Sequence, residues 1–211
     1  MLLGGVLFFL LYFKLSDVYF SNHITFRIFH CTSLSLLSLK NTIYYGKSII
    51  DSGSSLQTLY LSNESITLSL SNEDFYLKII PIYFIIYIIY DLKHSYKRID
   101  LLVHHLVCIL WALINFRNNI GFLSFCVFSE GVTFAYVVPT FTNQLIYRLL
   151  FTVIFRFTIW IVMIYEKCYH LLDDDYILNI FNIIIATFMI FIDCVWFNQN
   201  YKKLKKICNR D

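Results

Sequence analysis

The chain has 211 residues, of which 58% are hydrophobic, 19% aromatic and only 15% charged. This composition is too apolar for a soluble domain of this length and indicates an integral membrane protein. The net charge of +3 is too small to indicate a nucleic-acid partner, and the six cysteines form no C-x-x-C pair that would predict a zinc site or a disulfide framework.

The first two apolar segments are shorter or more polar than the later ones. Residues 1–13 are apolar but fall short of the ~20 residues that cross a bilayer. No basic residue precedes them and no clear small-residue cleavage site follows, so we interpret 1–23 as an anchor helix with its connector. Residues 24–45 form a candidate span with Arg27, His30 and many serines, which a membrane tolerates when the polar face lies inside a bundle.

Residues 46–74 are the one clearly hydrophilic segment, rich in Ser and Asn, which predicts a long loop. Within it, Asn63-Glu64-Ser65 is a glycosylation sequon, and such a sequon is used only on the lumenal side of a membrane. The sequon therefore favours a lumenal position for this loop.

Stronger apolar spans follow the loop, with short connections, so sequence neighbours should be antiparallel and adjacent. These spans are predicted at 75–92, 101–116, 120–138, 146–165 and 176–198. We predict an all-α fold, a polytopic transmembrane helix bundle of about seven spans. The membrane domain extends over 24–199, and a basic cytosolic tail follows at 200–211.

The distribution of charge in the short connections predicts the orientation. Basic residues gather at 93–98, at Arg148 and in the tail 200–211, which lie on one side of a seven-span bundle. The opposite side receives the loop 46–74 and the acidic run 173–175. The amino terminus is therefore expected in the lumen and the carboxyl terminus in the cytosol.

A histidine pair and one glutamate are the most informative polar groups, because ionisable side chains in apolar spans are costly and usually mark function. His104 and His105 lie 12 to 14 residues before the turn predicted near Arg117, and Glu130 lies 12 to 13 residues beyond it. In an antiparallel hairpin they share one depth, so we predict that they line one cavity open toward the cytosol. Adjacent helical residues point ~100° apart, so we expect one histidine to face the cavity and the other a neighbouring helix.

The other candidate ligand-binding residues, Arg27, His30, Asp91 and Arg156, fall in the same cytosolic half of the bundle, as does Asp193. Each also has a structural interpretation. Asp91 could cap a helix end or form an ion pair with Lys97 or Arg98. The Arg27 side chain could extend to the cytosolic interface of the membrane. His30 could be a hydrogen-bonded core residue, and Arg156 could form a buried ion pair.

Metal binding is a further interpretation of the histidine pair. Two histidines and Glu130 could ligate zinc or iron. Metal-binding histidines on a helix usually stand four residues apart on one face, whereas this pair is adjacent, so we predict no metal site.

Four sequence motifs, in a fixed order along the chain, carry a resemblance to a known family. They are Arg27-Ile28-Phe29-His30-Cys31, Tyr87-Ile88-Ile89-Tyr90-Asp91-Leu92, Arg98-Ile99-Asp100-Leu101-Leu102-Val103-His104-His105 and Ser129-Glu130-Gly131-Val132-Thr133-Phe134, with weaker echoes at Phe155-Arg156 and Trp196-Phe197. The chain resembles the TLC-domain family of TRAM, LAG and CLN-type membrane proteins. The resemblance covers about 27–197, and its most specific part is the histidine pair followed by an acidic residue on the next helix.

The resemblance implies a multi-helix, lipid-related protein of the endoplasmic reticulum or another endomembrane. The family's ceramide synthases transfer a fatty acyl group from coenzyme A to a sphingoid amine, and in them several aspartates follow the histidine pair. Here Glu130 is the one acidic residue in 115–138. The resemblance therefore favours the branches that bind, regulate or traffic membrane lipids, with no bound cofactor.

The alternative is an acyltransferase that uses acyl-CoA as co-substrate and a sphingoid lipid as acceptor. One histidine of the pair would then be the general base or carry the acyl group. Asp100, one helical turn before His104, would orient the base. Arg27, or Lys97 with Arg98, would hold the phosphates of coenzyme A.

Overall fold

The computed structural model describes residues 2–19, 23–51, 74–115, 123, 126–169, 171–172 and 175–209. Every regular element in these ranges is helical, so the all-α part of the prediction is confirmed. The elements are α1 (Leu2–Tyr19), α2 (His23–Asp51), α4 (Asp74–Ser95), α5 (Ile99–Asn115), the 3₁₀ helix η1 (Phe128–Val137), α7 (Phe141–Phe151), the π-helix η2 (Thr152–Phe157), α8 (Thr158–Tyr169) and α9 (Tyr176–Cys208).

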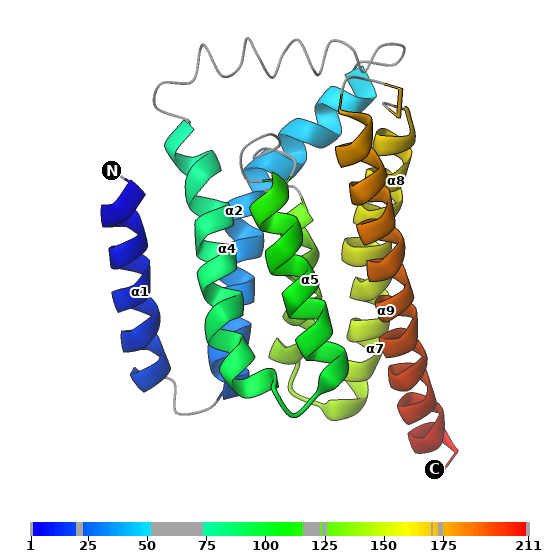
Figure 1. Cartoon of the computed structure of the whole chain (residues 1–211). Helices are drawn as coiled ribbons and strands as arrows, with labels where there is room; N and C mark the ends of the chain where they lie inside the picture. The colour runs from blue at the N-terminus through cyan, green and yellow to red at the C-terminus, as the bar shows by residue number, and fades with distance from the viewer. Residues whose placement is uncertain are drawn as a thin grey trace.

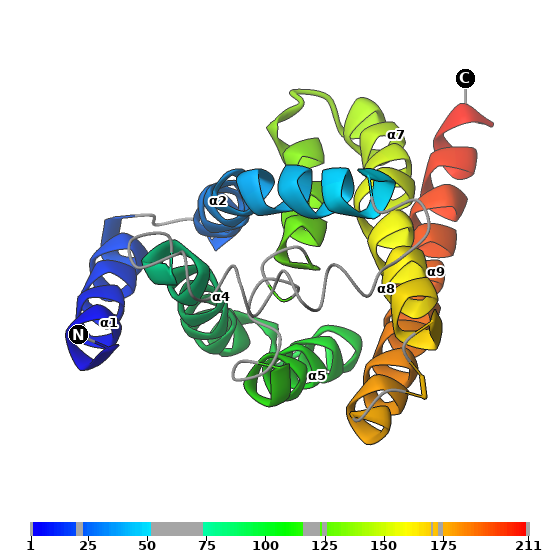
Figure 2. The ribbon, with the colours of Figure 1, turned by 90° about the horizontal axis from the view of Figure 1, so that it is seen from above.

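Most helices run up and down along one common direction (Figure 1), whereas the second half of α2 leans across the upper end of the bundle toward α8 (Figure 2). From above, α4, α2, η1, the α7–α9 group and α5 form a ring, and α1 lies outside it beside α4 (Figure 2). The turn between α4 and α5 and the last turns of α9 lie at the same end of the bundle, the lower end in Figure 1. Side chains that are far apart in the sequence therefore lie close together at this end.

Two helices in the described ranges are long and apolar enough to cross a membrane. They are Phe141–Tyr169, which is continuous through α7, η2 and α8, and Tyr176–Cys208, with mean hydropathies of 1.9 and 2.2. Ile99–Asn115 is apolar but shorter. The seven spans therefore stay a prediction. The sequon at Asn63, the turn near Arg117 and the acidic pair 173–174 lie outside the described residues.

Three boundaries differ from the sequence prediction. Helix α2 continues through Gly46 to Asp51, into the segment predicted as loop, because one glycine inside a helix costs only about 1 kcal/mol. The described part of the span predicted at 120–138 is mostly 3₁₀ helix. It ends where Val138, which precedes Pro139, adopts an extended conformation, as residues before proline prefer. The next helix begins earlier than predicted, at Phe141.

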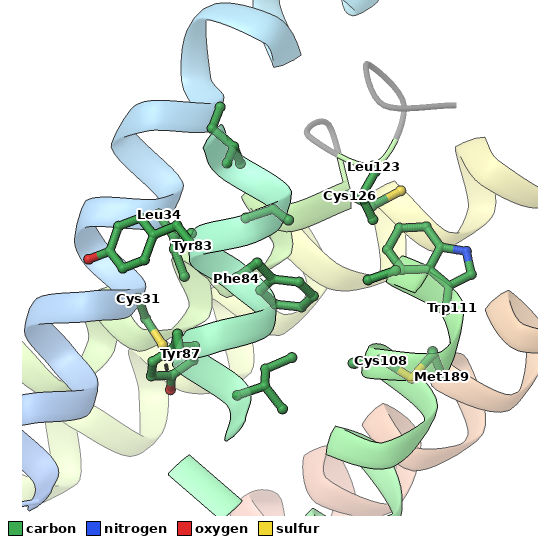
Figure 3. Close-up of a cluster of buried hydrophobic side chains, with 14 of the residues drawn as sticks. Cys31, Leu34, Tyr83, Phe84, Tyr87, Cys108, Trp111, Leu123, Cys126 and Met189 are labelled. Atoms are coloured by element: carbon green, nitrogen blue, oxygen red, sulfur yellow. Dashed lines mark hydrogen bonds between the residues drawn. The ribbon is translucent and has the colours of Figure 1, made fainter. Parts of the chain in front are cut away.

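The hydrophobic core joins α2, α4, α5 and α9 (Figure 3). On one side, the Cys31 thiol of α2 donates to the Tyr87 hydroxyl of α4 at 3.1 Å. On the other side, Cys108 and Trp111 of α5 lie near Met189 of α9. These buried side chains fix the positions of the helices around the polar end of the bundle.

Buried polar side chains also link the helices. His30 of α2 is fully buried, with Nε2 2.7 Å from the Ser16 hydroxyl of α1 and Nδ1 2.8 Å from the Tyr83 hydroxyl of α4. Asn115 of α5 and Asn182 of α9 exchange two amide hydrogen bonds of 3.0 and 3.1 Å. Both ring nitrogens of His30 have partners, and each amide of the Asn115–Asn182 pair donates to the oxygen of the other, which is the usual state of buried polar groups.

Candidate functional site

A polar cavity of about 160 Å³ lies at the lower end of the bundle in Figure 1. Arg98 and Lys203 are exposed at its mouth, whereas His104 and Arg156 are buried at its inner wall. The residues that line it come from α2, α4, α5, η1, α7, η2 and α9, together with the turn before α5: Arg27, Tyr87, Arg98, Leu101, His104, His105, Glu130, Val132, Thr133, Tyr136, Arg148, Thr152, Arg156, Asp193, Trp196, Gln199, Asn200 and Lys203.

The histidine pair and Glu130 line this one cavity, so the part of the prediction that concerns their common position is confirmed. The expectation that only one histidine faces the cavity is wrong. His105 approaches Asp91 of α4, whereas the ring of His104 lies 5.1 Å from that of Trp196 on α9. The cavity extends between α4 and α9, so two rings that diverge from α5 both reach its wall.

Both histidines keep one ring nitrogen without a hydrogen-bond partner in the described part of the chain. His105 Nε2 lies 3.3 Å from Asp91 Oδ2, and His104 Nε2 lies 3.7 Å from Cys108 Sγ, a weak contact. The Nδ1 atoms of both rings are buried and unpartnered. A buried polar atom without a partner costs free energy, so these two atoms are available to a ligand that supplies the missing hydrogen bonds.

Asp91 is the carboxylate closest to the histidine pair. It is fully buried and accepts two hydrogen bonds from Arg27, at 3.2 Å from Nε and 2.6 Å from Nη2. His23 Nε2 lies 2.7 Å from Oδ1, the oxygen that also accepts from Arg27 Nε. This bidentate pairing joins α2 to α4 and neutralises both charges.

A second buried ion cluster lies across the cavity, on η1, η2 and α9. Arg156 Nη1 donates to Asp193 at 2.7 Å, and Nη2 lies 3.8 Å from Glu130. Trp160 also donates to Asp193, at 2.9 Å, and the Cys31 thiol donates to Glu130 at 3.4 Å. Arg156 lies in the π-helical segment, and such segments occur often at functional sites.

Asp100 does not make the contact that the acyltransferase hypothesis requires. It accepts hydrogen bonds from Arg98 and, at 2.7 Å, from Trp196 Nε1, and none joins it to His104 among the described residues. Asp100 precedes the apolar part of α5, and the Arg98 guanidinium beside it lowers the pKa of this carboxyl below its ordinary value. The carboxylate that reaches the histidine pair is Asp91 instead.

The remaining candidates separate into lining and non-lining residues. Arg27 and Arg156 line the cavity together with Arg98, whereas His30 and Lys97 are absent from its wall. His30 belongs to the α1–α2–α4 link, because Ser16 and Tyr83 occupy both of its ring nitrogens.

Several residues of this site were missed by the sequence prediction. Asp193 was recognised as an ionisable group at the right depth but was not assigned to the site. Trp196 appeared as a weak motif only, and Arg148 and Lys203 were used only as indicators of orientation. Their depth was visible in the sequence, but the helix packing that turns them toward one cavity was not.

The described residues contain no group of three or more His, Cys, Asp or Glu side chains arranged to hold a metal ion. The carboxylates near the histidines are instead in contact with guanidinium groups, Asp91 with Arg27 and Asp193 with Arg156. The arrangement is suited to hydrogen-bonding a polar group, and His105 beside Asp91 is also suited to accepting a proton.

Comparison of the chain with protein-family models, with curated proteins and with solved structures finds no match.

Proposed function

We propose that the chain is a multi-pass membrane protein of the TLC type that binds, regulates or traffics lipids through this cavity, in a membrane of the endoplasmic reticulum or another endomembrane. The proposal keeps the predicted orientation, with the lower end of the bundle in Figure 1 toward the cytosol. One observation carries it: the two buried imidazoles that line one cavity each keep an Nδ1 atom without a hydrogen-bond partner in the described part of the chain.

The membrane part of the proposal is supported by apolar surface. In the most apolar stretches of Phe141–Tyr169 and Tyr176–Cys208, only 28% and 33% of the residues are buried inside the protein. On α5, Leu106, Leu110 and Leu113 are between 50% and 58% exposed, opposite the buried His104. Helices that are apolar on their outer faces are stabilised by lipid rather than by water.

The binding part of the proposal is supported by the incomplete hydrogen bonding of the cavity. Nδ1 of His104, Nδ1 of His105 and Nε of Arg156 are all buried without a partner. Few buried polar groups stay unpaired in folded proteins, so unpaired groups that share one cavity indicate a ligand. A polar lipid headgroup with hydroxyl or amine groups supplies both hydrogen-bond donors and acceptors, which match an arginine N–H and the imidazole nitrogens.

The acyltransferase stays the second candidate, because His105 Nε2 lies 3.3 Å from the buried Asp91 carboxylate. A carboxylate that orients an imidazole is the usual support for a general base. The imidazole would remove a proton from an amine or hydroxyl as it attacks the thioester of acyl-CoA. The acyl carbon would form the new bond, and the thiolate of coenzyme A would leave and take up a proton.

The decisive experiment compares the wild-type chain with the His104→Ala/His105→Ala variant in cells that lack their own ceramide synthases. We expect a lipid to co-purify with the wild-type chain and to be identified by mass spectrometry. We expect this lipid to be lost from the variant, and neither chain to form ceramide from radiolabelled acyl-CoA. Ceramide formed by the wild type and lost in a variant that still inserts would favour the acyltransferase. A wild-type chain that carries no lipid would contradict the proposal.

A further inference from the structure

The cavity has more positive than negative charge along its wall. Five cations line it, from Arg27, Arg98, Arg148, Arg156 and Lys203. Three of them contact carboxylates: Arg27 contacts Asp91, Arg98 contacts Asp100, and Arg156 contacts Asp193 and, more distantly, Glu130. The other two, Arg148 and Lys203, form no ion pair within the described part of the chain.

Arg148 is held in a fixed position although it has no carboxylate partner. Its guanidinium carbon lies 3.9 Å from the centre of the Tyr136 ring, and its Nε is buried without a hydrogen-bond partner. An arginine stacked on an aromatic face keeps its N–H donors directed outward in the plane of the guanidinium, where they can bind an oxyanion bidentately. The stacking on Tyr136 therefore restrains the guanidinium of this half-buried side chain before any ligand binds.

The last turns of α9 contribute a further part of the cavity lining. Gln199 and Asn200 stand four and three residues before Lys203, so both lie on the same face of this helix as Lys203, and all three line the cavity. The two amides provide neutral donors, and the lysine provides a mobile positive charge. Helices α7 and α9 lie beside each other in both views of the bundle (Figures 1 and 2).

We propose that Arg148 and Lys203, with Gln199 and Asn200, form a subsite for a phosphate group at the mouth of the cavity. The inference rests on the proposed function and specifies the chemical class of its ligand as an anion. A phosphate group presents several acceptor oxygens in different directions, and donors from two helices, α7 and α9, line the same cavity. Arginine and lysine are both regular phosphate ligands, one as a bidentate fork and the other as a point charge.

The test uses the full chain, purified in a maltoside detergent that contains no phosphate, and isothermal titration calorimetry. The probes are dihexanoyl phosphatidic acid, dihexanoylglycerol as the same lipid without phosphate, and inorganic phosphate alone. We expect phosphatidic acid to bind with a dissociation constant at least tenfold lower than that of dihexanoylglycerol. We expect Arg148→Gln and Lys203→Gln each to raise that constant by roughly tenfold, the loss of one charged hydrogen bond.

The matched control is Lys202→Gln, which removes the same charge one position earlier on α9, at an exposed residue that does not line the cavity. We expect it to leave the dissociation constant unchanged. Arg148→Lys keeps the charge but not the stacked fork, and we expect it to restore part of the affinity lost in Arg148→Gln. Lys203 is exposed, so its substitution keeps the test valid even where Arg148→Gln impairs folding.

The outcomes answer two questions: whether the phosphate subsite exists, and whether its ligand is a free phosphate or a lipid headgroup. Inorganic phosphate that binds as tightly as phosphatidic acid, with the same dependence on Arg148 and Lys203, identifies a free phosphate as the ligand. Binding of phosphatidic acid alone identifies a lipid headgroup. Equal binding of phosphatidic acid and dihexanoylglycerol, or wild-type affinity in both glutamine variants, would overturn the inference.

Failure of the proposed function gives a different pattern. If the lipid function is wrong, neither lipid probe binds and no lipid co-purifies, whatever inorganic phosphate does. If only the phosphate subsite is wrong, dihexanoylglycerol binds as well as phosphatidic acid, and the binding depends on His104 and His105.

Discussion

Three buried histidines of this protein lie in two contrasting environments. His30 joins α1, α2 and α4, and both of its ring nitrogens have hydroxyl partners within 2.8 Å. His104 and His105 are almost as deeply buried and line the cavity, but each keeps an Nδ1 without a partner among the described residues. The same residue type therefore completes a structural link in one region and leaves hydrogen-bonding capacity in the other.

The contrast separates groups that stabilise the fold from groups that are available to a ligand. A satisfied buried polar group contributes to stability, and its removal leaves its partners unpaired. An unsatisfied buried group costs stability, and such a cost is typical of binding sites. Substitutions in the two regions should therefore have opposite effects on stability and on ligand binding.

The largest loss of stability is expected from substitution of Arg156, whose guanidinium has both a paired and an unpaired nitrogen. Its Nη1 is paired with Asp193, whereas its Nε is buried and unpartnered. The change Arg156→Met leaves Asp193 and Glu130 buried near each other without their cation. We expect the free energy of unfolding to fall by about 3–5 kcal/mol, the usual cost of breaking a buried ion pair from one side. Unfolding of the detergent-solubilised protein by a denaturant measures it.

The control for this prediction is Arg98→Met, because the Arg98 side chain is 57% exposed and its pair with Asp100 is solvated. We expect a change of at most about 1 kcal/mol there. Equal losses in Arg98→Met and Arg156→Met would show that the buried cluster is no more important to stability than a surface pair.

A smaller effect is expected from two matched substitutions of histidine by leucine. His30→Leu removes the imidazole partner of the Ser16 hydroxyl and one hydrogen bond of the Tyr83 hydroxyl, so we expect a loss of about 1–3 kcal/mol in the free energy of unfolding. His104→Leu removes a buried nitrogen that has no partner, so we expect stability to stay equal or to rise. Co-purified lipid should decrease only in His104→Leu. A loss of stability in His104→Leu as large as that in His30→Leu would refute the contrast between the two regions.

The sequence predicted the depth of the site better than its contacts. Counting residues from the expected turn placed His104, His105 and Glu130 at one level, and all three line one cavity. The residue count was correct because the depth of a side chain depends on its position along a helix. It was correct although η1 is a 3₁₀ helix rather than an α-helix. The sequence also correctly predicted that the regular elements of the described ranges are helices, because long apolar segments with few glycines and prolines leave few alternatives.

Lateral contacts could not be predicted in the same way. Helical spacing placed Asp100 one turn from His104, yet Asp100 accepts a hydrogen bond from Trp196, 96 positions later in the chain. The packing of the whole bundle decides which helix lies beside α5. The 3.6-residue period of a helix shows only which residues share a face of that helix, not which helix packs against that face. The roles of Arg148 and Asp193 were missed for the same reason.

The smallest effect is expected at Trp196, which closes one side of the cavity. Its ring lies 5.1 Å from that of His104 and 5.4 Å from the Arg156 guanidinium, and its Nε1 donates to Asp100. Trp196→Phe keeps an aromatic face but removes the donor, so we expect a loss of about 0.5–1.5 kcal/mol in the free energy of unfolding. In Trp196→Leu, which also removes the aromatic face, the further loss should stay near 1 kcal/mol, the value of a cation–π contact. If Trp196→Phe costs as much as Arg156→Met, then the single hydrogen bond between α9 and Asp100 contributes as much to stability as the buried ion cluster of η1, η2 and α9, which would contradict this ranking.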